Sequence, residues 1–130
     1  MGVNRFEDLR VWQLAKAFSD EIGGLIRRPA MQKDFAMCRQ LSAASLSIVA
    51  NIAEGFVRGR GQKFVQKEFI QFVRIGAGSN GEARALLHAA FGRRYLETAE
   101  YERLVEMTQS IGRTLRVFER RLREPRTPNT

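Results

Sequence analysis

The sequence predicts an all-α fold, an antiparallel up-down four-helix bundle. Four segments of about 20 to 30 residues repeat apolar residues three and four positions apart, which is the spacing of one helix face. The prolines Pro29, Pro125 and Pro128 all lie outside these segments, so long helices are allowed. No stretch shows the alternation of a strand, and the short connections favour antiparallel neighbours.

The first helix is expected over about residues 8–27, with Pro29 ending it. Its apolar face is Val11, Ala15, Phe18, Ile22 and Leu25. The second is expected over about residues 32–54. Its face is Cys38, Leu41, Ser45, Ile48 and Ile52, flanked by small residues that let a neighbouring backbone come close. Gly55 is typical of the residue that follows a helix, so residues 55–62 are predicted to form a basic, glycine-broken loop.

The third helix is expected over about residues 63–92, with the face Val65, Phe69, Phe72, Gly76, Ser79, Ala83, Leu86 and Ala90. Gly76, Gly78 and Gly81 each cost about 1 kcal/mol relative to alanine, so we expect close helix packing to offset them. The fourth is expected over about residues 99–123, with Thr98 as its N-cap. Its face is Tyr101, Leu104, Thr108, Ile111, Leu115, Phe118 and Leu122. The chain is interpreted as one domain, residues 1–130, with a loose tail over 124–130.

The composition is that of a basic globular protein. The 130 residues carry 22 Lys and Arg against 14 Asp and Glu, a net charge of +8. A pI near 10.7 favours a polyanionic partner, although a soluble protein can also be basic without one. Cys38 is the only cysteine, which excludes an internal disulfide and suits a reducing compartment. The longest charge-free stretch, Gln40–Ala53, is too short to span a bilayer, so we expect a cytoplasmic protein with no membrane partner.

The sequence gives no sign of an active site. Gly76–Gly81 matches the nucleotide-binding pattern G-x-G-x-x-G, but the helical repeat runs through it without a change of period. His88 is the only histidine, and Ala85 stands where a Glu-x-x-His metal motif needs its carboxylate. One histidine must also serve every candidate Ser or Cys nucleophile. We therefore expect no catalytic residues, no metal and no cofactor.

Basic residues gather near one end of the predicted bundle. In an antiparallel arrangement, the arginine-rich end of the fourth helix lies near the start of the third helix and the preceding loop. This geometry suits contact with phosphates, although arginines at a helix C-terminus also complement its dipole. The predicted nucleic-acid-binding residues are Arg58, Arg60, Lys63, Lys67, Arg113, Arg116, Arg120, Arg121 and Arg123. Because aromatic residues do not alternate with them, base-specific recognition of single strands is not indicated.

Four polar residues stand out in the second and third helices: Asn51, Glu54, Ser79 and Glu82. Asn51 is next to the predicted core residue Ile52, and Glu82 is next to Ala83. The four residues could form a shared functional site. They could also form a hydrogen-bonded cluster that fixes helix register and caps the second helix, and we favour this structural interpretation because buried polar groups must find partners.

Three motifs resemble those of the four-helix bundle family found in intervening sequences of bacterial 23S ribosomal RNA genes. They are Phe6–Trp12 (FEDLRVW), Asn51–Gly55 (NIAEG) preceded by Gln40-Leu41 and Ser47-Ile48, and Gly78–Glu82 (GSNGE). The likeness extends from about Phe6 to Leu122, with Ala83 departing from the larger aliphatic that relatives often carry. It offers no catalytic residues to carry over. The landmarks that carry over, interpreted as structural, are Asn51, Glu54, Gly55, Gly78, Ser79 and Glu82.

The resemblance implies a four-helix bundle that assembles into a ring-like homopentamer. It also implies distant kinship with the accessory protein of diversity-generating retroelements, which is basic, binds nucleic acid and partners a reverse transcriptase. Two hypotheses follow from the residues and the resemblance together. The favoured one is a non-enzymatic oligomeric adaptor that binds RNA or DNA through phosphates. The alternative is a structural scaffold whose basic end docks an acidic protein.

Overall fold

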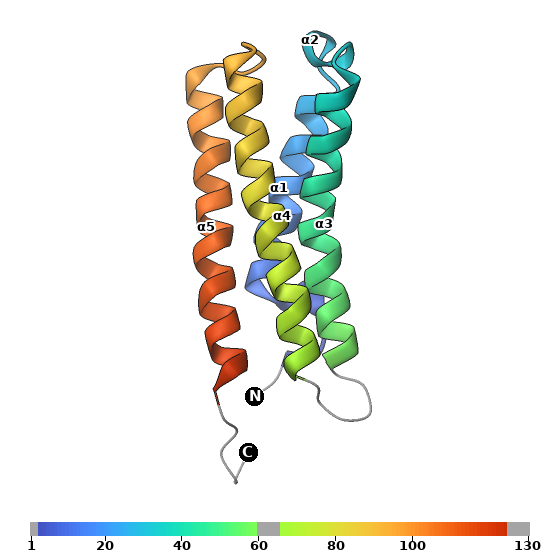
Figure 1. The fold of residues 1–130 in the computed structure, drawn as a ribbon, viewed down its shortest axis with the longest axis vertical. Coiled ribbons are helices and arrows are strands. Elements are labelled where there is room, and N and C mark those ends of the chain that lie inside the picture. The colour runs from blue at the N-terminus through green and yellow to red at the C-terminus, as the bar shows by residue number, and fades with distance from the viewer. Residues whose placement is uncertain (1–2, 60–65, 125–130) are drawn as a thin grey trace.

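The computed structural model describes residues 3–59 and 66–124, and within these ranges the only regular structure is helical. Four long helices run alternately up and down: α1 (Arg10–Ile26), α3 (Phe35–Gly59), α4 (Gln66–Gly92) and α5 (Thr98–Arg123) (Figure 1). Two short helices, η1 (Phe6–Asp8) and α2 (Pro29–Gln32), precede α1 and α3. The prediction of an all-α, up-down four-helix bundle is confirmed.

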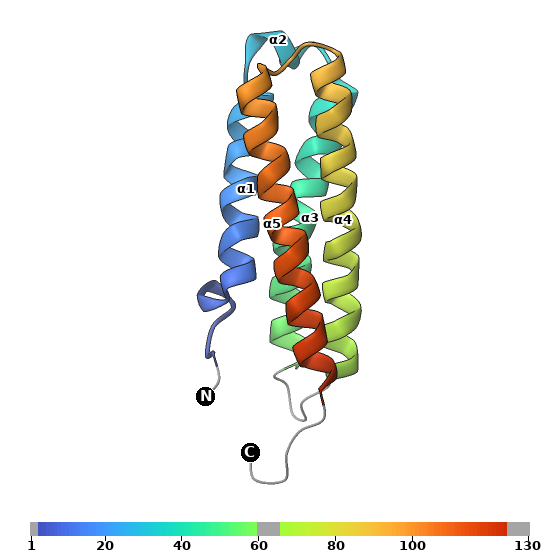
Figure 2. The same cartoon turned by 90° about the vertical axis from the view of Figure 1, so that its left-hand side faces the viewer.

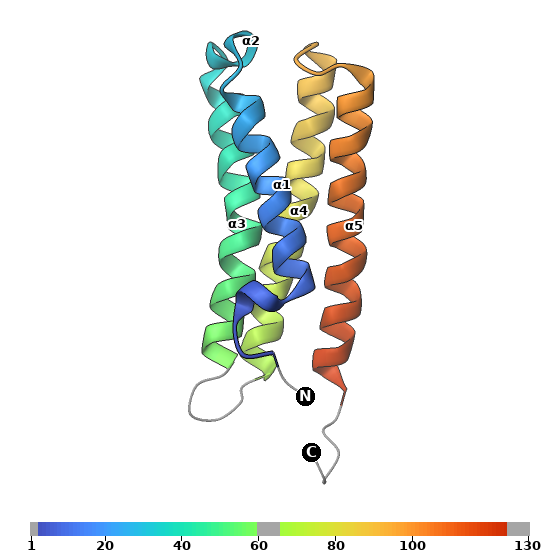
Figure 3. The same ribbon diagram turned by 180° about the vertical axis from the view of Figure 1, so that it is seen from behind.

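Each long helix packs against two others. α3 lies between α1 and α4, and α5 closes the bundle against α1 and α4 (Figures 2 and 3). One end of the bundle carries α2 and the α4–α5 turn. The other end brings together the last turns of α3 and α5 and the first turn of α4 (Figure 1). We call this second end the basic end; it comprises the described residues 56–59, 66–69 and 120–124.

The predicted apolar faces of the helices form most of the core. All five predicted residues of α1 are buried. In α5 the predicted Tyr101 and Phe118 are half-buried, and the other five residues are buried. In α3 only Cys38 leaves the predicted core. Its thiol is half-buried and donates to the Met31 carbonyl oxygen at 3.1 Å, and desolvation raises its pKa.

The buried stripe of α4 agrees with the predicted one only in part. Phe69, Gly76, Ala83 and Ala90 are buried as predicted, and Val73, Asn80 and Leu87 are buried beside them. The predicted Phe72, Ser79 and Leu86 are only half-buried, and Val65 lies outside the described residues. α4 packs against both α3 and α5, so the middle of its buried face points between these two helices. Asn80 is accommodated there because its amide Nδ2 donates to the Thr108 carbonyl oxygen at 2.8 Å.

Two predicted ends of the second helix are wrong. α3 begins at Phe35 rather than near Gln32, because the Asp34 carboxylate accepts the Met37 N–H at 3.2 Å and starts the helix there. At its other end, α3 continues through Gly55 to Gly59, so Gly55 is not the residue that follows the helix. A Cβ at Gly55 would lie 2.8 Å from Phe69 Cδ1, and this glycine therefore allows close packing.

The remaining helix limits differ by smaller amounts. α1 begins at Arg10, because η1 occupies residues 6–8. α5 begins at Thr98, so the predicted N-cap is inside the helix; Glu97 takes the cap position without a side-chain hydrogen bond. The predicted start of the third helix at Lys63 and the tail from residue 125 onward lie outside the described residues.

By length and apolar composition alone, α3 could cross a membrane, and it is the one helix in the described part of the chain that meets this test. The core helix of a soluble protein meets the same test. Only 39% of its most apolar window is buried within the bundle. Much of the apolar surface of α3 therefore faces outward.

Candidate nucleic-acid interface

Two hollows follow the outer seam between α4 and α5. The first lies near the basic end and is lined by the cations Lys67, Arg74 and Arg123 together with neutral side chains. The second, of about 420 Å³, lies further along the same seam. Its cations are Arg84, Arg113 and Arg116. We call these six residues, together with the exposed Arg120, the basic face.

Carboxylates neutralise only part of the basic face. Glu119 pairs with Arg74 at 3.0 Å and with Arg123 at 2.9 Å, and these contacts, led by the hydrogen bond from Arg123, lower its pKa. Glu106 pairs with Arg113 at 3.1 Å. Within residues 3–59 and 66–124, the other four side chains form no ion pair; these are Lys67, Arg84, Arg116 and Arg120.

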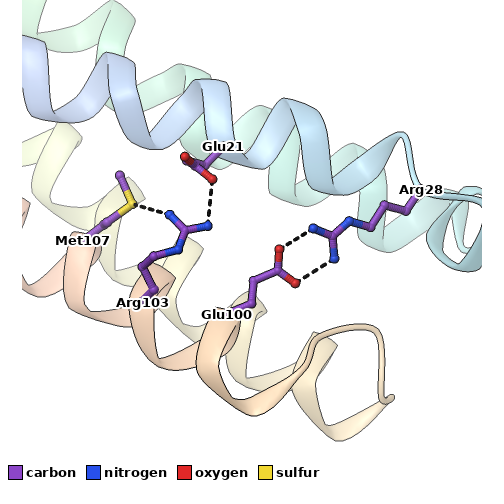
Figure 4. Close-up of polar contacts among 5 residues, drawn as sticks. All are labelled: Glu21, Arg28, Glu100, Arg103 and Met107. Carbon is purple, nitrogen blue, oxygen red and sulfur yellow. Dashed lines mark hydrogen bonds and ion pairs between the residues drawn. The ribbon is translucent and has the colours of Figure 1, made fainter.

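The arginines of the α1–α5 seam are used differently. Near the α2 end, Arg28 makes a two-pronged contact with Glu100, with Nη1 donating to Oε1 at 2.7 Å (Figure 4). One turn along, Arg103 donates to Glu21 at 2.9 Å. The hydrogen bonds that both guanidinium groups donate to these carboxylates raise the pKa of Arg28 and of Arg103. These arginines join α1 to α5, whereas the unpaired cations of the basic face are free to meet an external anion.

The predicted phosphate-contact residues are only partly brought together. Lys67, Arg113, Arg116, Arg120 and Arg123 belong to the basic face. Two other predicted residues in the described part of the chain do not. Arg58 pairs with Glu54 and Glu68, at 2.8 and 3.3 Å, and its guanidinium lies over the Phe72 ring. Arg121 borders a different hollow, beside α1.

Arg60 and Lys63 were also predicted to contact phosphate, and both lie outside the described residues. Arg74 and Arg84 were not predicted, although they share the basic segment that contains Lys67. Lys67 and Arg74 are seven positions apart, and this spacing could have indicated that they share one face of the helix. The position of Arg84 depends on how α4 and α5 are aligned, which the sequence pattern does not give.

The family landmarks meet on the outer seam between α3 and α4. Ser47 and Ser79 share a hydrogen bond of 2.7 Å between their Oγ atoms, and Asn51 Nδ2 donates to Ser47 at 3.0 Å. This supports the structural interpretation for Asn51 and Ser79. The two carboxylates lie outside the cluster: Glu54 pairs with Arg58, and Glu82 has no partner within the described ranges.

Two of the three predicted glycines of α4, Gly78 and Gly81, do not serve the role predicted for them. A Cβ at Gly76 would make ordinary contacts of 3.9 to 4.0 Å with α3. At Gly78 and Gly81 a Cβ would meet nothing within 4 Å. The prediction that close helix packing explains these two glycines is therefore wrong within one protomer. Their missing side chains leave the α4 backbone open on the outside of the bundle.

The G-x-G-x-x-G match lies inside α4, which is helical from Gln66 to Gly92, rather than at a strand-to-helix turn. His88 lies on the surface beside Tyr101, whose phenol oxygen is 2.5 Å from His88 Nδ1. Among the described residues, no three His, Cys, Asp or Glu side chains gather as a metal site would require.

Fold and surface together define a class: a basic, all-α bundle with unneutralised arginines along one helix seam. The model of the 23S rRNA-intervening sequence protein family matches residues 7–117, and the chain belongs to this family. A solved structure with the same fold is a protein of unknown function from the S23 ribosomal protein family of Bacteroides thetaiotaomicron. The two chains are 21% identical with a TM-score of 0.72, over 84% of this chain and 97% of that one. No curated protein matches the sequence.

Proposed function

We propose that this protein is a non-enzymatic, oligomeric adaptor that binds nucleic acid through its phosphates. The observation that carries the proposal is the basic face. Its two hollows gather six cations, and among the described residues only Glu106 and Glu119 pair with them. Cations left without carboxylate partners on one surface are suited to neutralise phosphates, with release of the counterions around the nucleic acid.

The dimensions and chemistry of the face support contact with a backbone rather than with bases. Lys67 and Arg84 are separated by 17 positions of one helix, which corresponds to about 25 Å. No aromatic side chain lines either hollow on the described seam. Without stacking platforms, the face favours binding that depends on salt and tolerates many sequences.

Self-association is the second part of the proposal, and it rests on α3. Leu46 and Val57 are 55% and 60% exposed on its outer side. Ala50 and Ala53 lie between them beside a shallow apolar hollow. We propose that a second copy of the chain covers this stripe, in keeping with the ring-like pentamer that the family resemblance implies. An oligomer would repeat the basic face and multiply its affinity for a long polyanion.

The phosphate contacts are tested by fluorescence anisotropy with labelled structured RNA and duplex DNA, from low to physiological salt. The test variant is Lys67→Gln/Arg116→Gln/Arg120→Gln. The matched control, Arg27→Gln/Lys33→Gln/Arg39→Gln, removes the same charge from exposed positions near the α2 end. We expect the test variant to weaken binding to both nucleic acids and to flatten the dependence on salt, and the control to do neither.

Equal losses in the two variants would mean that net charge alone drives binding, which contradicts the proposed face. If the unaltered protein does not bind either nucleic acid at physiological salt, the nucleic-acid role fails. The basic face would then fit the alternative of docking an acidic protein.

Self-association is tested separately with Leu46→Glu/Val57→Glu, because both side chains are exposed and the protomer core does not need them. Light scattering after gel filtration should show an oligomer for the unaltered protein and a monomer for the variant. An oligomer of unchanged mass in the variant would place the interface elsewhere.

A further inference from the structure

We propose that the α4–α5 hollow around Gly81 and Gly112 is a binding site for a single phosphate group. The basic face would then contain one defined binding site in addition to its general positive charge. This inference rests on the proposed function in using the same face, and it names the group that the face holds. The ligand is a phosphate, whether free or within a nucleic-acid backbone.

Three arginines from two helices surround the hollow: Arg84 from α4, and Arg113 and Arg116 from α5. Arg116 reaches across Gly112, since its Nη1 atom lies 3.7 Å from the position that a Cβ on Gly112 would occupy. Asn80 Nδ2 lies 3.4 Å from the same position. The guanidinium of Arg116 is therefore held close to the floor of the hollow.

Carboxylates in the described part of the chain balance only some of the charge of this site. Among the described residues, Glu106 is the only carboxylate that pairs with any of the three arginines, and it contacts Arg113. Arg84 and Arg116 are thus two cations without an ion-pair partner in one hollow. Guanidinium groups bind phosphate oxygens in pairs of parallel hydrogen bonds, so a phosphate would satisfy both.

Gly81 gives the hollow its access to the helix backbone. A glycine within a helix costs about 1 kcal/mol relative to alanine. Packing inside the protomer does not require this glycine, because a Cβ there would meet nothing within 4 Å. An anion that approaches α4 from outside would explain it, since a side chain at this position would fill the space between the arginines.

The floor of the hollow contains an unsatisfied acceptor. Asn80 is 7% exposed, and its Nδ2 is used by the Thr108 carbonyl oxygen. Its Oδ1 is buried and accepts no hydrogen bond from the described residues. Buried amide oxygens normally have a donor. The Oδ1 atom has no exposed surface, so it is not a contact for the ligand; the Asn80 amide instead forms a fixed floor for the hollow through its hydrogen bond to Thr108.

The test uses the full chain and inorganic phosphate, with chloride of equal ionic strength as the control anion. Titration is followed by calorimetry and by the amide resonances of Gly81 and Gly112. The variant Gly81→Leu fills the hollow and keeps every arginine. Its matched control is Gly24→Leu in α1, another exposed helix glycine where a Cβ would meet nothing within 4 Å. Circular dichroism verifies that both variants fold.

We expect phosphate, and not chloride, to shift the two glycine resonances, and Gly81→Leu to weaken phosphate binding at least tenfold while Gly24→Leu leaves it unchanged. Arg84→Gln/Arg116→Gln should give the same loss without filling the hollow. Equal effects of phosphate and chloride, or equal binding by the two leucine variants, would overturn the site.

RNA titrations of the same variants separate the two sources of phosphate. Parallel loss of phosphate and RNA binding in Gly81→Leu supports a site for the backbone, whereas loss of phosphate binding alone supports a site for the free anion. The two proposals also fail separately. RNA binding without a phosphate site would overturn this inference only, and a phosphate site without RNA binding would overturn the nucleic-acid role only.

Discussion

The two sides of α4 are built for different purposes. Toward α3, the helix is closely packed: Gly55 and Gly59 admit the ring of Phe69, and Ser79 bonds to Ser47. Toward α5, the Asn80–Thr108 hydrogen bond and the Arg74–Glu119 ion pair cross the seam, and hollows lined by arginine remain open along it. One helix therefore closes the fold on one side and presents charge on the other.

The comparison shows that a helix glycine has two structural meanings. At Gly55 the space that a side chain would fill is taken by α4, with Phe72 Cβ only 2.9 Å from the position of a Cβ. At Gly81 the missing side chain leaves an open space. Local sequence does not separate the two cases, but substitution with alanine should do so by the sign of its effect on stability.

The largest effect on stability is expected for Gly55→Ala. The added methyl group would press on Phe72 Cβ, which is attached directly to the α4 backbone, so the helix itself must shift. Overpacking of this kind costs about 1 to 3 kcal/mol, a loss that the higher helix propensity of alanine offsets only in part. Urea unfolding should therefore give a lower midpoint with an unchanged slope.

Gly78→Ala is the matched control, because a Cβ there meets nothing within 4 Å. We expect this variant to gain up to about 1 kcal/mol of stability from helix propensity. A loss of stability similar to that of Gly55→Ala would show that the α3 side is not the more closely packed one, and the comparison would fail.

The hydroxyl pair on the α3 side gives a smaller effect. Ser79→Ala removes one partner of the 2.7 Å contact, while Ser47 keeps its hydrogen bond from Asn51. The expected loss is about 0.5 to 1.5 kcal/mol. A double-mutant cycle with Ser47→Ala should show coupling between the two positions; strictly additive effects would mean that the serines do not interact.

The sequence predicts the parts of this fold that depend on one helix at a time. The stripes of α1 and α5 could be found because mostly apolar residues repeat every three or four positions. The end of α3 could not be predicted in this way, because a glycine after Glu54 is typical of a helix end. Gly55 is instead explained by a contact with Phe69, which is distant in sequence.

The candidate site could be predicted only in part, because the sequence pattern reports one helix at a time. Lys67 and the arginines of α5 stood out as local clusters of charge. The role of Arg84, the pairing of Arg58 with Glu68 and the hollow at Gly81 all depend on the alignment of two helices. This alignment is set by packing across the bundle, so no pattern within one segment reports it.

Glu119→Gln tests the α5 side, with a cost in stability of at most about 1 kcal/mol because the ion pairs are partly exposed. The variant frees both Arg74 and Arg123 from their carboxylate. We therefore expect tighter binding of RNA and a steeper dependence on salt, measured by anisotropy. Weaker binding would indicate that Glu119 positions these arginines for the phosphates and does not merely compete with them.

The smallest effect is expected at Asp34, which lies between α2 and α3 and contacts the residues that follow α4. Its carboxylate accepts hydrogen bonds from Tyr95 at 2.8 Å and Met37 at 3.2 Å and pairs with Arg93 at 2.6 Å, which lowers its pKa below the ordinary 3.8. Because the folded state holds the charged form more tightly, its contribution to stability is complete above pH 3.8 and is lost as the pH falls through the lower folded value.

Asp34→Asn keeps an oxygen for the Met37 N–H but removes the charge. Urea unfolding of both proteins from pH 6 down to about pH 3 should therefore show a gap in stability that is constant above pH 3.8 and narrows as the pH falls below that value. A gap that stays constant with pH would mean that Asp34 acts through its hydrogen bonds alone. The attachment of α3 to the end of α4 would then be as independent of charge as the glycine contacts further along the same side.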